Sequence, residues 1–411
     1  MPPHQACSRS GPATPIQISS GATIDERYLE YAAHGGFNNQ RRNLFHGLLM
    51  AHALNRVLLL PPALSHRAAP HYGQCPSHVA PPSAILERFE KAAVNAEKAA
   101  SIKKPQDLPS ASLQRLLNFT QVADLVAVAD LGAVDTSSIA SALVKYDCTN
   151  TIWTFASSNG GCRARDGWRA RGACRCRDVS KTLGTVSQPL LRIGSTFKGF
   201  DTDPIRSTVW GARLQRATLT YTDPMLHVAR HASSKFARNR NYVALHLRGG
   251  DGEFRRRFHQ TVRNAFKELI TSYLARRKKA TAPEVLPVPL YVASDTSYRT
   301  SREFREGLAR LAAVVRKEAG GASGEAITVS YLRKVVPDAQ KAVVEASDTP
   351  QNGRLLAHAP DLDMHLDLLI CAHALLGFGG TAGSSVSSSI RTLRKYHLSD
   401  ERAVVNSLAD H

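Results

Sequence analysis

The sequence lacks the features that mark several large classes of protein. It has no run of about 18 apolar residues, so no segment is typical of a membrane-spanning helix. No unit of roughly 20–50 residues repeats along the chain, which argues against a repeat architecture. No secretory signal or anchor is evident at the start, where residues 1–22 are rich in Pro, Ser and Gln and predict a disordered leader.

Negative charge is scarce relative to positive charge. The chain has 53 Lys and Arg against 34 Asp and Glu, a formal net charge of +19. This balance suits anionic partners such as nucleic acid or phosphorylated ligands. Only Arg255–Arg257 and Arg276–Lys279 are compact basic clusters, however, and neither is interleaved with aromatic residues. We therefore expect both to be solvated helix faces, and we do not expect binding to nucleic acid.

The chain has enough hydrophobic residues to form a large globular core. The chain has 411 residues, of which 43% are hydrophobic and 21% charged. Such a length indicates two or three domains or one large α/β unit.

Four of the seven cysteines fall within one segment, residues 148–176. Two interpretations are open: a disulfide-stapled loop in an oxidising compartment, or a zinc site. Cys174 and Cys176 are separated by one residue, which does not match the usual C-x₂-C pair of zinc ligands. Zinc is therefore the weaker interpretation.

Both halves of the chain alternate strand-like and helical segments. Near the start, the pattern predicts a strand at Tyr28–Ala33, a Gly-rich loop, a helix at Arg41–Leu54 and a strand at Val57–Leu60, which is a parallel βαβ unit. The second half predicts strands at Tyr242–Leu247, Leu290–Ala293, Ala326–Tyr331 and Leu376–Gly379. Its helices are expected at 222–238, Phe254–Ala275, Ser301–Lys317, Met364–Leu375 and Val386–Tyr396, with loops at Gly320–Ser323 and Ser347–Arg354.

Three polar motifs follow strands of the second half, where ligands bind in open α/β sheets. In His246–Asp251, an Arg whose charge is permanent follows an apolar strand and precedes Gly249-Gly250, an arrangement that suits a phosphate. Asp295 ends Tyr291–Asp295, where it fits either a ribose or base contact or the N-cap of the next helix. Gly379–Ser385 leads into a helix from Val386 and suits either a phosphate cradle or a plain Ser-capped helix start.

A fourth glycine-rich helix start lies near the N-terminus, where Gly35-Gly36 precede Asn38-Asn39. It can also host an anion or a sugar hydroxyl.

The sequence does not support two other classes of ligand, nucleotides bound by a P-loop or dinucleotide motif and metal ions. The glycine motifs lack the Gly-Lys-Ser/Thr ending of a P-loop and the pattern of a dinucleotide site. Asp361-Leu362-Asp363 precedes a predicted helix, and helix capping is expected there rather than metal binding.

Taken together, the motifs resemble those of the GDP-fucose protein O-fucosyltransferase family. Gly35–Gln40, with Leu54–Pro62, is similar to its N-terminal signature, His246–Asp251 to its H-x-R segment, and Phe378–Ser387 to its C-terminal G-T-x-x-S-S/T-x-S segment. The resemblance implies an α/β, GT-B-like fold of two Rossmann-like domains facing a cleft. Residues 23–235 would form the acceptor side, with 148–176 as an insertion, and residues 236–411 would bind GDP-fucose.

The resemblance also implies roles for residues. Arg248 would contact the diphosphate and Asn39 would lie by the phosphate and sugar, and both are expected to be catalytic. Ser384-Ser385 would lie against the phosphates and Asp295 near the nucleoside. The full set of expected substrate-binding residues is Gly35, Gly36, Phe37, Asn38, His246, Asp251, Asp295, Thr381, Gly383, Ser384, Ser385 and Val386.

The implied activity is an inverting transfer of fucose from GDP-fucose to a Ser or Thr hydroxyl of a protein, without a metal or cofactor, in the endoplasmic reticulum or Golgi. Two alternatives stay open: transfer to a glycan in α-1,6 linkage, and a GDP-sugar-binding protein without activity. The general base is unassigned, because Gly36 stands where some members carry Glu. His34, Asp251, Glu253 or a base-free mechanism assisted by the diphosphate are the candidates.

Overall fold

The structure is a computed structural model. It describes residues 27–31, 36–61, 63, 113–123, 125–131, 134, 138–139, 141–147, 152–155, 158–163, 183–184, 186–193, 209–237, 240–249, 252–278, 286–295, 298, 301–321, 325–357, 359 and 361–396. The expected leader 1–22 and most of the cysteine-rich segment lie outside this set, and so do Gly35, Asp251 and His34.

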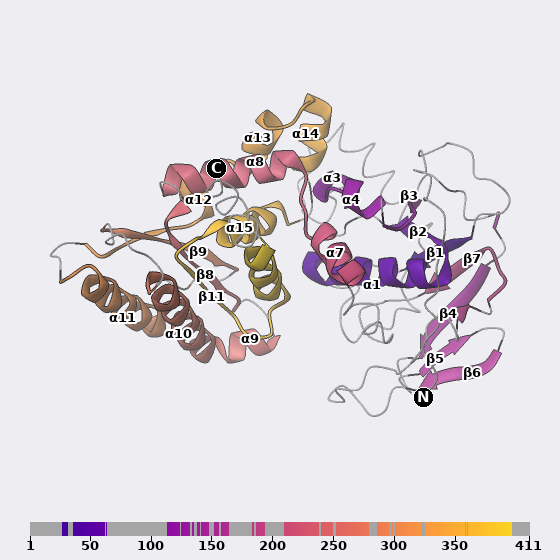
Figure 1. The fold of residues 1–411 in the computed structure, drawn as a ribbon, viewed down its shortest axis with the longest axis horizontal. Helices are drawn as coiled ribbons and strands as arrows, with labels where there is room; N and C mark the ends of the chain where they lie inside the picture. The colour runs from indigo at the N-terminus through magenta and orange to yellow at the C-terminus, as the bar shows by residue number, and fades with distance from the viewer. Residues whose placement is uncertain are drawn as a thin grey trace, which may run out of the picture.

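The described chain forms two α/β units that lie side by side (Figure 1). The N-terminal unit contains a seven-stranded sheet in the order β3-β2-β1-β7-β4-β5-β6. Its strands are β1 Tyr28–Tyr31, β2 Val57–Leu60, β3 Val128–Asp130, β4 Ser141–Asp147, β5 Ile152–Phe155, β6 Ser158–Arg163 and β7 Leu190–Ile193. Strands β3, β2, β1, β7 and β4 are parallel, and β5 and β6 extend the sheet as an antiparallel pair.

The C-terminal unit contains a parallel four-stranded sheet in the order β10-β9-β8-β11. Its strands are β8 Val243–Leu247, β9 Val288–Ser294, β10 Ile327–Ser330 and β11 Gly377–Gly380. Together, the two mainly parallel sheets and their helices confirm the α/β, GT-B-like architecture that the motifs implied.

Helices of the N-terminal unit and of the connection are α1 Phe37–Leu54, α3 Leu113–Leu116, α4 Thr120–Ala123, α7 Val209–Ala217 and α8 Asp223–Phe236. The later helices are α9 Gly252–Arg256, α10 Phe258–Arg277, α11 Arg302–Glu318, α12 Leu332–Val335, α13 Ala339–Glu345, α14 Pro350–Ala357, α15 Leu362–His373 and the helix 385–396. Within the described residues, none of these helices combines the length and the apolar character that crossing a membrane requires.

Side chains of β8 alternate between two cores, as the sequence predicted. Val243 and Leu245 pack with α10 and α11 on one face of the sheet. Ala244 points to the other face, where α8, α15 and the helix 385–396 pack. This second core continues without a break into the N-terminal unit, where it includes α1 and β1, so the two units share one apolar interior.

Three expected boundaries need correction. The segment Ser347–Arg354, predicted as a loop, contains most of α14, because Thr349 Oγ1 accepts from Asn352 N at 3.3 Å and Gly353 allows the helix to approach Val344 closely. α1 begins at Phe37, four residues before the predicted start. β11 spans Gly377–Gly380, so the strand predicted at Leu376–Gly379 extends one residue further and includes Gly380.

The expected domain boundary at residues 235/236 stays a prediction. α8 ends at Phe236 and packs against α15, and its buried residues join the core shared by the two units.

Candidate functional site

Three neighbouring strands of the C-terminal sheet end in the polar motifs that the sequence singled out. Arg248 follows β8, Asp295 follows β9 and Thr381 follows β11, and these strands are adjacent in the order β9-β8-β11. α9, which comes after β8, lies on the side of this unit that is turned toward the N-terminal unit (Figure 1). The sheet therefore brings the three motifs together at its carboxyl edge, as the parallel arrangement predicted.

Thr381 joins the ends of β8 and β11. Its buried Oγ1 donates to the carbonyl oxygen of His246 at 3.2 Å and accepts from the backbone N–H of Arg248 at 2.9 Å. Its own N–H donates to the same carbonyl at 3.1 Å. The backbone on both sides of Leu247 is thus fixed, and with it the point from which the Arg248 side chain leaves the sheet.

Asp295 is exposed and holds the loop that follows β8. Its Oδ1 accepts from the backbone N–H of Gly249 at 2.8 Å. The alternative interpretation of Asp295 as an N-cap is wrong, because α11 begins at Arg302 and Ser301 caps it, accepting from Phe304 N. The carboxylate therefore orients the Gly249 backbone beside Arg248.

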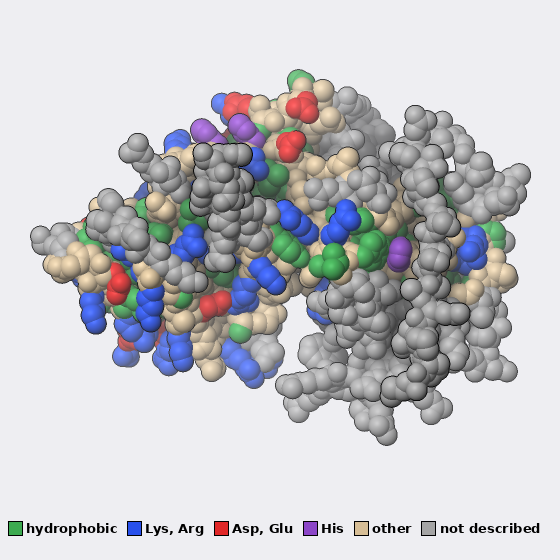
Figure 2. Space-filling model, viewed as in Figure 1, with side chains coloured by type: hydrophobic (Ala, Val, Ile, Leu, Met, Phe, Trp, Pro, Cys, Tyr) green, Lys and Arg blue, Asp and Glu red, His purple; other side chains and the backbone are tan. Residues whose placement is uncertain are grey.

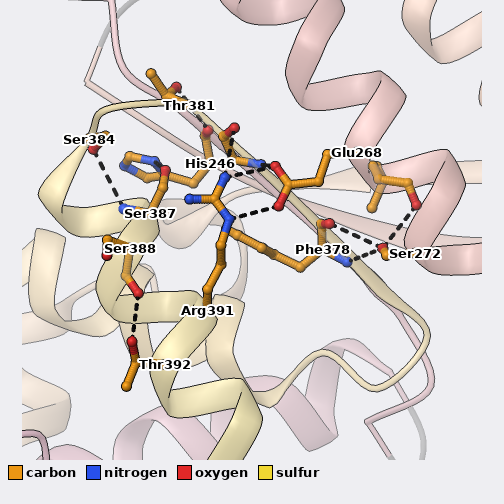
Figure 3. Close-up of polar contacts among 12 residues, drawn as sticks. His246, Glu268, Ser272, Phe378, Thr381, Ser384, Ser387, Ser388, Arg391 and Thr392 are labelled. Carbon is orange, nitrogen blue, oxygen red and sulfur yellow. Dashed lines mark hydrogen bonds and ion pairs between the residues drawn. The ribbon is translucent and has the colours of Figure 1, made fainter. Parts of the chain in front are cut away.

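His246 is buried and neutral. Its Nδ1 lies 2.7 Å from the Oγ of Ser387, in the first turn of the helix 385–396 (Figure 3). Burial, with the nearby charges of Arg248 and Arg391, lowers the pKa of the imidazole to about 3. His246 is therefore uncharged near neutral pH and contributes a hydrogen-bonding ring rather than a positive charge.

Arg248 supplies the positive charge at this edge. Its side chain is partly exposed, and its guanidinium carbon lies 4.9 Å from the centre of the Phe254 ring in α9. Such a cation–π contact restricts the orientation of the side chain. Phe254 was not predicted as part of the site, since an aromatic residue on a helix has many structural uses.

The turn after β11 combines a left-handed glycine with a Ser-capped helix start. Gly383 has φ +77°, a left-handed conformation that favours glycine, and a side chain there would meet open space. Ser384 is buried and its Oγ accepts from Ser387 N at 3.5 Å, so the predicted Ser-capped helix start is confirmed (Figure 3). Ser385 is partly exposed in the first helical turn, and Val386 is buried. Ser384 therefore caps the helix, while Ser385 lies at the surface.

Gly379 and Gly380 of β11 are needed for close packing of helices against the strand, not for the approach of a ligand. A Cβ on Gly379 would collide with the carbonyl oxygen of Ala265 in α10 and stand 2.8 Å from Leu269 Cβ. A Cβ on Gly380 would stand 2.9 Å from Ser387 Cβ on the other face. These glycines let two helices approach the strand closely, and only Gly383 gives the turn its conformation.

An ion pair that the sequence did not reveal lies beside this turn. Glu268 in α10 binds Arg391 through two hydrogen bonds, Nε to Oε1 at 2.7 Å and Nη2 to Oε2 at 2.8 Å (Figure 3). The two residues are 123 positions apart in the chain. No local pattern marks them, because each looks like an ordinary charge on a helix.

The N-terminal helix start is occupied by a contact between the units. Phe37 packs edge-on against the buried His365 of α15, with ring centres 4.1 Å apart. Asn38 Nδ2 donates to Met364 Sδ at 3.3 Å, and Asn38 Oδ1 accepts from Arg41 Nη2 at 2.7 Å. Burial lowers the pKa of the Arg41 guanidinium.

Asn39 and Gly36 remain partly exposed at this helix start. Gly36 occupies the N-cap position with φ −62°, and its carbonyl oxygen accepts from Asn39 N at 2.7 Å and from Gln40 N at 3.1 Å. Phe37, Asn38 and Gln40 are buried. Of the expected residues described at this start, Asn39 is thus the one with a partly exposed side chain, and Gly35 lies outside the described residues.

Asp361 does not cap α15 in the expected way. It occupies the N-cap position with φ 56°, but its side chain makes no capping hydrogen bond, so that prediction is wrong. Among the residues that the structure describes, no three His, Cys, Asp or Glu side chains gather as a metal site. Cys371 is a free buried thiol, and the open question of a disulfide or zinc cluster at 148–176 lies outside the described side chains.

Basic side chains gather over α9, α10 and α11, at the lower left of Figure 2. Arg255, Arg256 and Arg257 are exposed, while Arg276 and Arg277 are partly exposed at the end of α10. The expectation of a solvated helix face is therefore confirmed for Arg255–Arg257, whereas Arg276 and Arg277 are only partly solvated.

Comparison with known proteins gives one consistent result. The model of the family described as GDP-fucose protein O-fucosyltransferase matches residues 28–397. O-fucosyltransferase 30 of Arabidopsis thaliana is 23% identical over 445 residues, which cover 93% of this chain and 85% of that protein. Crystal structures of POFUT1 in its apo form and with GDP-fucose are each 15% identical and cover 91% of this chain, at 97% and 96% of their own length, with TM-scores of 0.48 and 0.46.

Proposed function

The chain belongs to the GDP-fucose protein O-fucosyltransferase family, and on that premise we propose that it transfers fucose from GDP-fucose to a Ser or Thr hydroxyl of a protein, with inversion and without a metal ion. Membership confirms the resemblance seen in the three motifs and makes the chain a GDP-fucose-dependent fucosyltransferase. The acceptor, the stereochemistry and the independence from metal are the parts that we propose.

One observation supports the proposed donor site most directly. Thr381 Oγ1 contacts both the His246 carbonyl oxygen and the Arg248 N–H, and so joins the H-x-R segment to the turn at Gly383. Two motifs that are 133 residues apart therefore form one surface. A permanent guanidinium charge and the N-terminus of a helix meet there, which is the chemistry that a diphosphate requires.

The reaction creates negative charge on the departing GDP. As the bond from the anomeric carbon to the phosphate oxygen breaks, the sugar passes through an oxocarbenium-like state and the diphosphate takes the electron pair. We propose that Arg248 and the first turn of the helix 385–396 stabilise that charge, with Ser385 donating a hydrogen bond. A fixed cation of this kind can take the place of a metal ion.

His246 fits a supporting role in this scheme. Its neutral ring is held by Ser387, and burial keeps its pKa near 3. An imidazole in that state cannot compete with Arg248 as a cation, but it can fix the strand end from which Arg248 extends.

The acceptor hydroxyl must reach the opposite face of the anomeric carbon. In our proposal, Asn39 lies on that side, because its side chain is partly exposed at the start of α1. The acceptor oxygen forms the new bond, and its proton passes to a base or to the departing diphosphate. Among the candidate bases, His34 and Asp251 lie outside the described residues, and the side chain of Glu253 does too.

The proposed place of the reaction is the secretory pathway, where protein acceptors carry O-linked fucose. The alternative transfer to a glycan and the alternative of binding without turnover remain distinct outcomes of the experiment below.

The test is a transfer assay in EDTA with radiolabelled GDP-fucose, a panel of folded secreted domains and a panel of free glycans. We expect label on Ser or Thr of a protein, unaffected by the chelator, with the anomer of the product opposite to that of the donor. Label on glycans alone would favour the α-1,6 alternative, and GDP binding without any transfer would favour an inactive sugar-nucleotide-binding protein.

A further inference from the structure

β11 is the edge strand of the C-terminal sheet, yet its outer edge is covered. Alternate residues of a strand direct their backbone groups to opposite sides, and the sheet order places β8 on one side of β11. On the other side, the backbone groups of Phe378 and Gly380 would be left without partners. Native proteins usually cover such an edge.

Side chains of two helices provide that cover. Ser272 Oγ, from α10, accepts from Phe378 N at 2.8 Å and donates to Phe378 O at 3.1 Å. One turn earlier in α10, Glu268 Oε2 accepts from Gly380 N at 3.0 Å, and Arg391 Nη2 donates to Gly380 O at 3.3 Å. Figure 3 shows both sets of contacts along the strand.

The Glu268–Arg391 pair joins the two helix layers around the edge of the sheet. α10 packs in the core on one face, while Val386, Ile390 and Leu393 of the helix 385–396 pack in the core on the other face. The bidentate pair therefore links the layers and binds both backbone groups of Gly380 at the same time.

Gly380 directly precedes Thr381. Contacts that hold Gly380 therefore also affect the position of Thr381 in the proposed donor site. We propose that Glu268 and Arg391 are positioning residues: they fix Gly380, so that the Thr381 hydroxyl, the Gly383 turn and the Arg248 backbone stand ready for the diphosphate of the donor. This inference rests on the proposed function and names the residues that set the geometry of that site.

The exposure of the pair separates positioning from a general contribution to stability. Glu268 and Arg391 have side-chain exposures of 35% and 39%, and ion pairs at such positions usually contribute little to folding. A bidentate pair with fixed geometry can still orient the groups that it binds. Its loss should therefore affect donor binding more than the unfolding midpoint.

Ser272 offers a matched control. It binds the same strand from the same helix, but at Phe378, two residues further from the Thr381 turn. Ser272→Ala removes a strand-edge contact without touching Gly380. Glu268→Gln keeps an oxygen that can accept from Gly380 N but removes the charge, whereas Glu268→Ala removes both.

The experiment measures three quantities for the wild type and these variants at a temperature where each is folded: the dissociation constant of GDP, kcat and KM for GDP-fucose, and hydrogen exchange of residues 380–385 without ligand. We expect Glu268→Ala to weaken GDP binding roughly 3- to 30-fold, to raise KM, and to speed exchange in the turn. Glu268→Gln should lie between it and the wild type, and Ser272→Ala should bind GDP as the wild type does.

Two outcomes would overturn the inference. One is equal GDP affinity and equal exchange in the wild type and Glu268→Ala. The other is an equal loss in Glu268→Ala and Ser272→Ala, which would mean that the edge matters only for general stability. If the wild type itself does not bind GDP, the proposed function fails, while the exchange comparison still tests whether the pair holds the turn.

Discussion

Two helices of this chain begin at a glycine-rich turn, and their first turns make different contacts. At α1, Phe37 and Asn38 pack against His365 and Met364 of α15. At the helix 385–396, Ser384 caps the helix from within while Ala382, Gly383 and Ser385 stay at least partly exposed. The start of α1 is thus a junction between the two units, whereas the start of the helix 385–396 remains exposed.

The difference shows that a glycine-rich helix start does not by itself define an anion site. Both starts offer the backbone N–H groups and the positive end of a helix dipole. The neighbouring structure distinguishes the two: α15 covers one helix start, whereas Thr381 and the Glu268–Arg391 pair hold the backbone around the strand that leads into the other. The predictions below test this contrast, from the largest expected effect to the smallest.

The largest effect on turnover is expected from Arg248, at the donor site proposed beside the start of the helix 385–396. Arg248→Ala should lower kcat/KM for GDP-fucose about 100- to 1,000-fold, because the growing charge of the diphosphate loses its fixed cation. The far-UV circular dichroism spectrum and the unfolding midpoint should stay close to those of the wild type, since the side chain is partly exposed.

Arg256→Ala is the matched control for Arg248→Ala, because Arg256 is an exposed basic residue of the neighbouring α9. It should keep near-normal turnover. Turnover of Arg248→Ala at the wild-type rate would contradict the assignment of the donor site.

The next prediction compares the cost in stability of an added Cβ in the strand, at Gly379, with that in the turn, at Gly383. Gly379→Ala should destabilise the protein by about 3 kcal/mol, because its Cβ meets the α10 backbone. Gly383→Ala should cost about 1 kcal/mol, since the penalty is its left-handed backbone and the space around it is open. Denaturant unfolding of both variants measures the difference, and equal costs would contradict the packing described for β11.

A pH effect of intermediate size follows from His246. Its folded-state pKa of about 3 lies below the ordinary value of about 6.5, so its contribution to stability is full above pH 6.5 and is lost as the pH falls toward 3. His246→Gln should therefore remove about 1.4 kcal/mol per pH unit from the slope of unfolding free energy against pH between 4 and 6.

Asp367 provides the opposing control for this measurement. Burial raises its pKa to about 7, so its contribution is present below about pH 3.8 and is lost as the pH rises through 7. Asp367→Asn should steepen the same slope that His246→Gln flattens. A shift in the same direction for both variants would contradict the environments described for the two side chains.

The smallest effect on GDP binding is expected from Arg41 in α1, the helix whose start is covered by α15. Arg41→Met replaces a buried guanidinium with a shorter apolar chain, which removes the cost of burying the charge but also removes the donor to Asn38 Oδ1, two effects that oppose each other. We expect the GDP dissociation constant to stay within about twofold and the unfolding free energy to change by less than about 1 kcal/mol. Calorimetric titration with GDP measures the first quantity, and a tenfold loss of affinity would mean that α1 belongs to the diphosphate site.

Much of this arrangement was predictable from local pattern. Alternation in Tyr242–Leu247 gave the two faces of β8, and the positions of Arg248, Asp295 and Thr381 after three strands predicted their meeting at one edge. These inferences succeed because side-chain period and parallel pairing follow from backbone geometry.

What could not be predicted depends on contacts between distant segments. Glu268 and Arg391 are ordinary helix charges until the fold brings them to Gly380. Asn38 resembled a ligand residue because the sequence does not show that Met364 and His365 cover that turn. Asp295 resembled an N-cap, and its true partner, Gly249, lies 46 residues earlier in the chain.

The most direct test of the central claim, that the carboxyl edge of the C-terminal sheet binds a guanosine diphosphate without a metal, is thermal unfolding in EDTA with GDP, GMP or ADP. GDP at about 100 times its dissociation constant should stabilise the wild type by about 2.7 kcal/mol, while GMP and ADP should shift it little. The shift with GDP should largely disappear in Arg248→Ala. An unfolding midpoint that GDP leaves unchanged, or raises only when a divalent cation is added, would contradict the account.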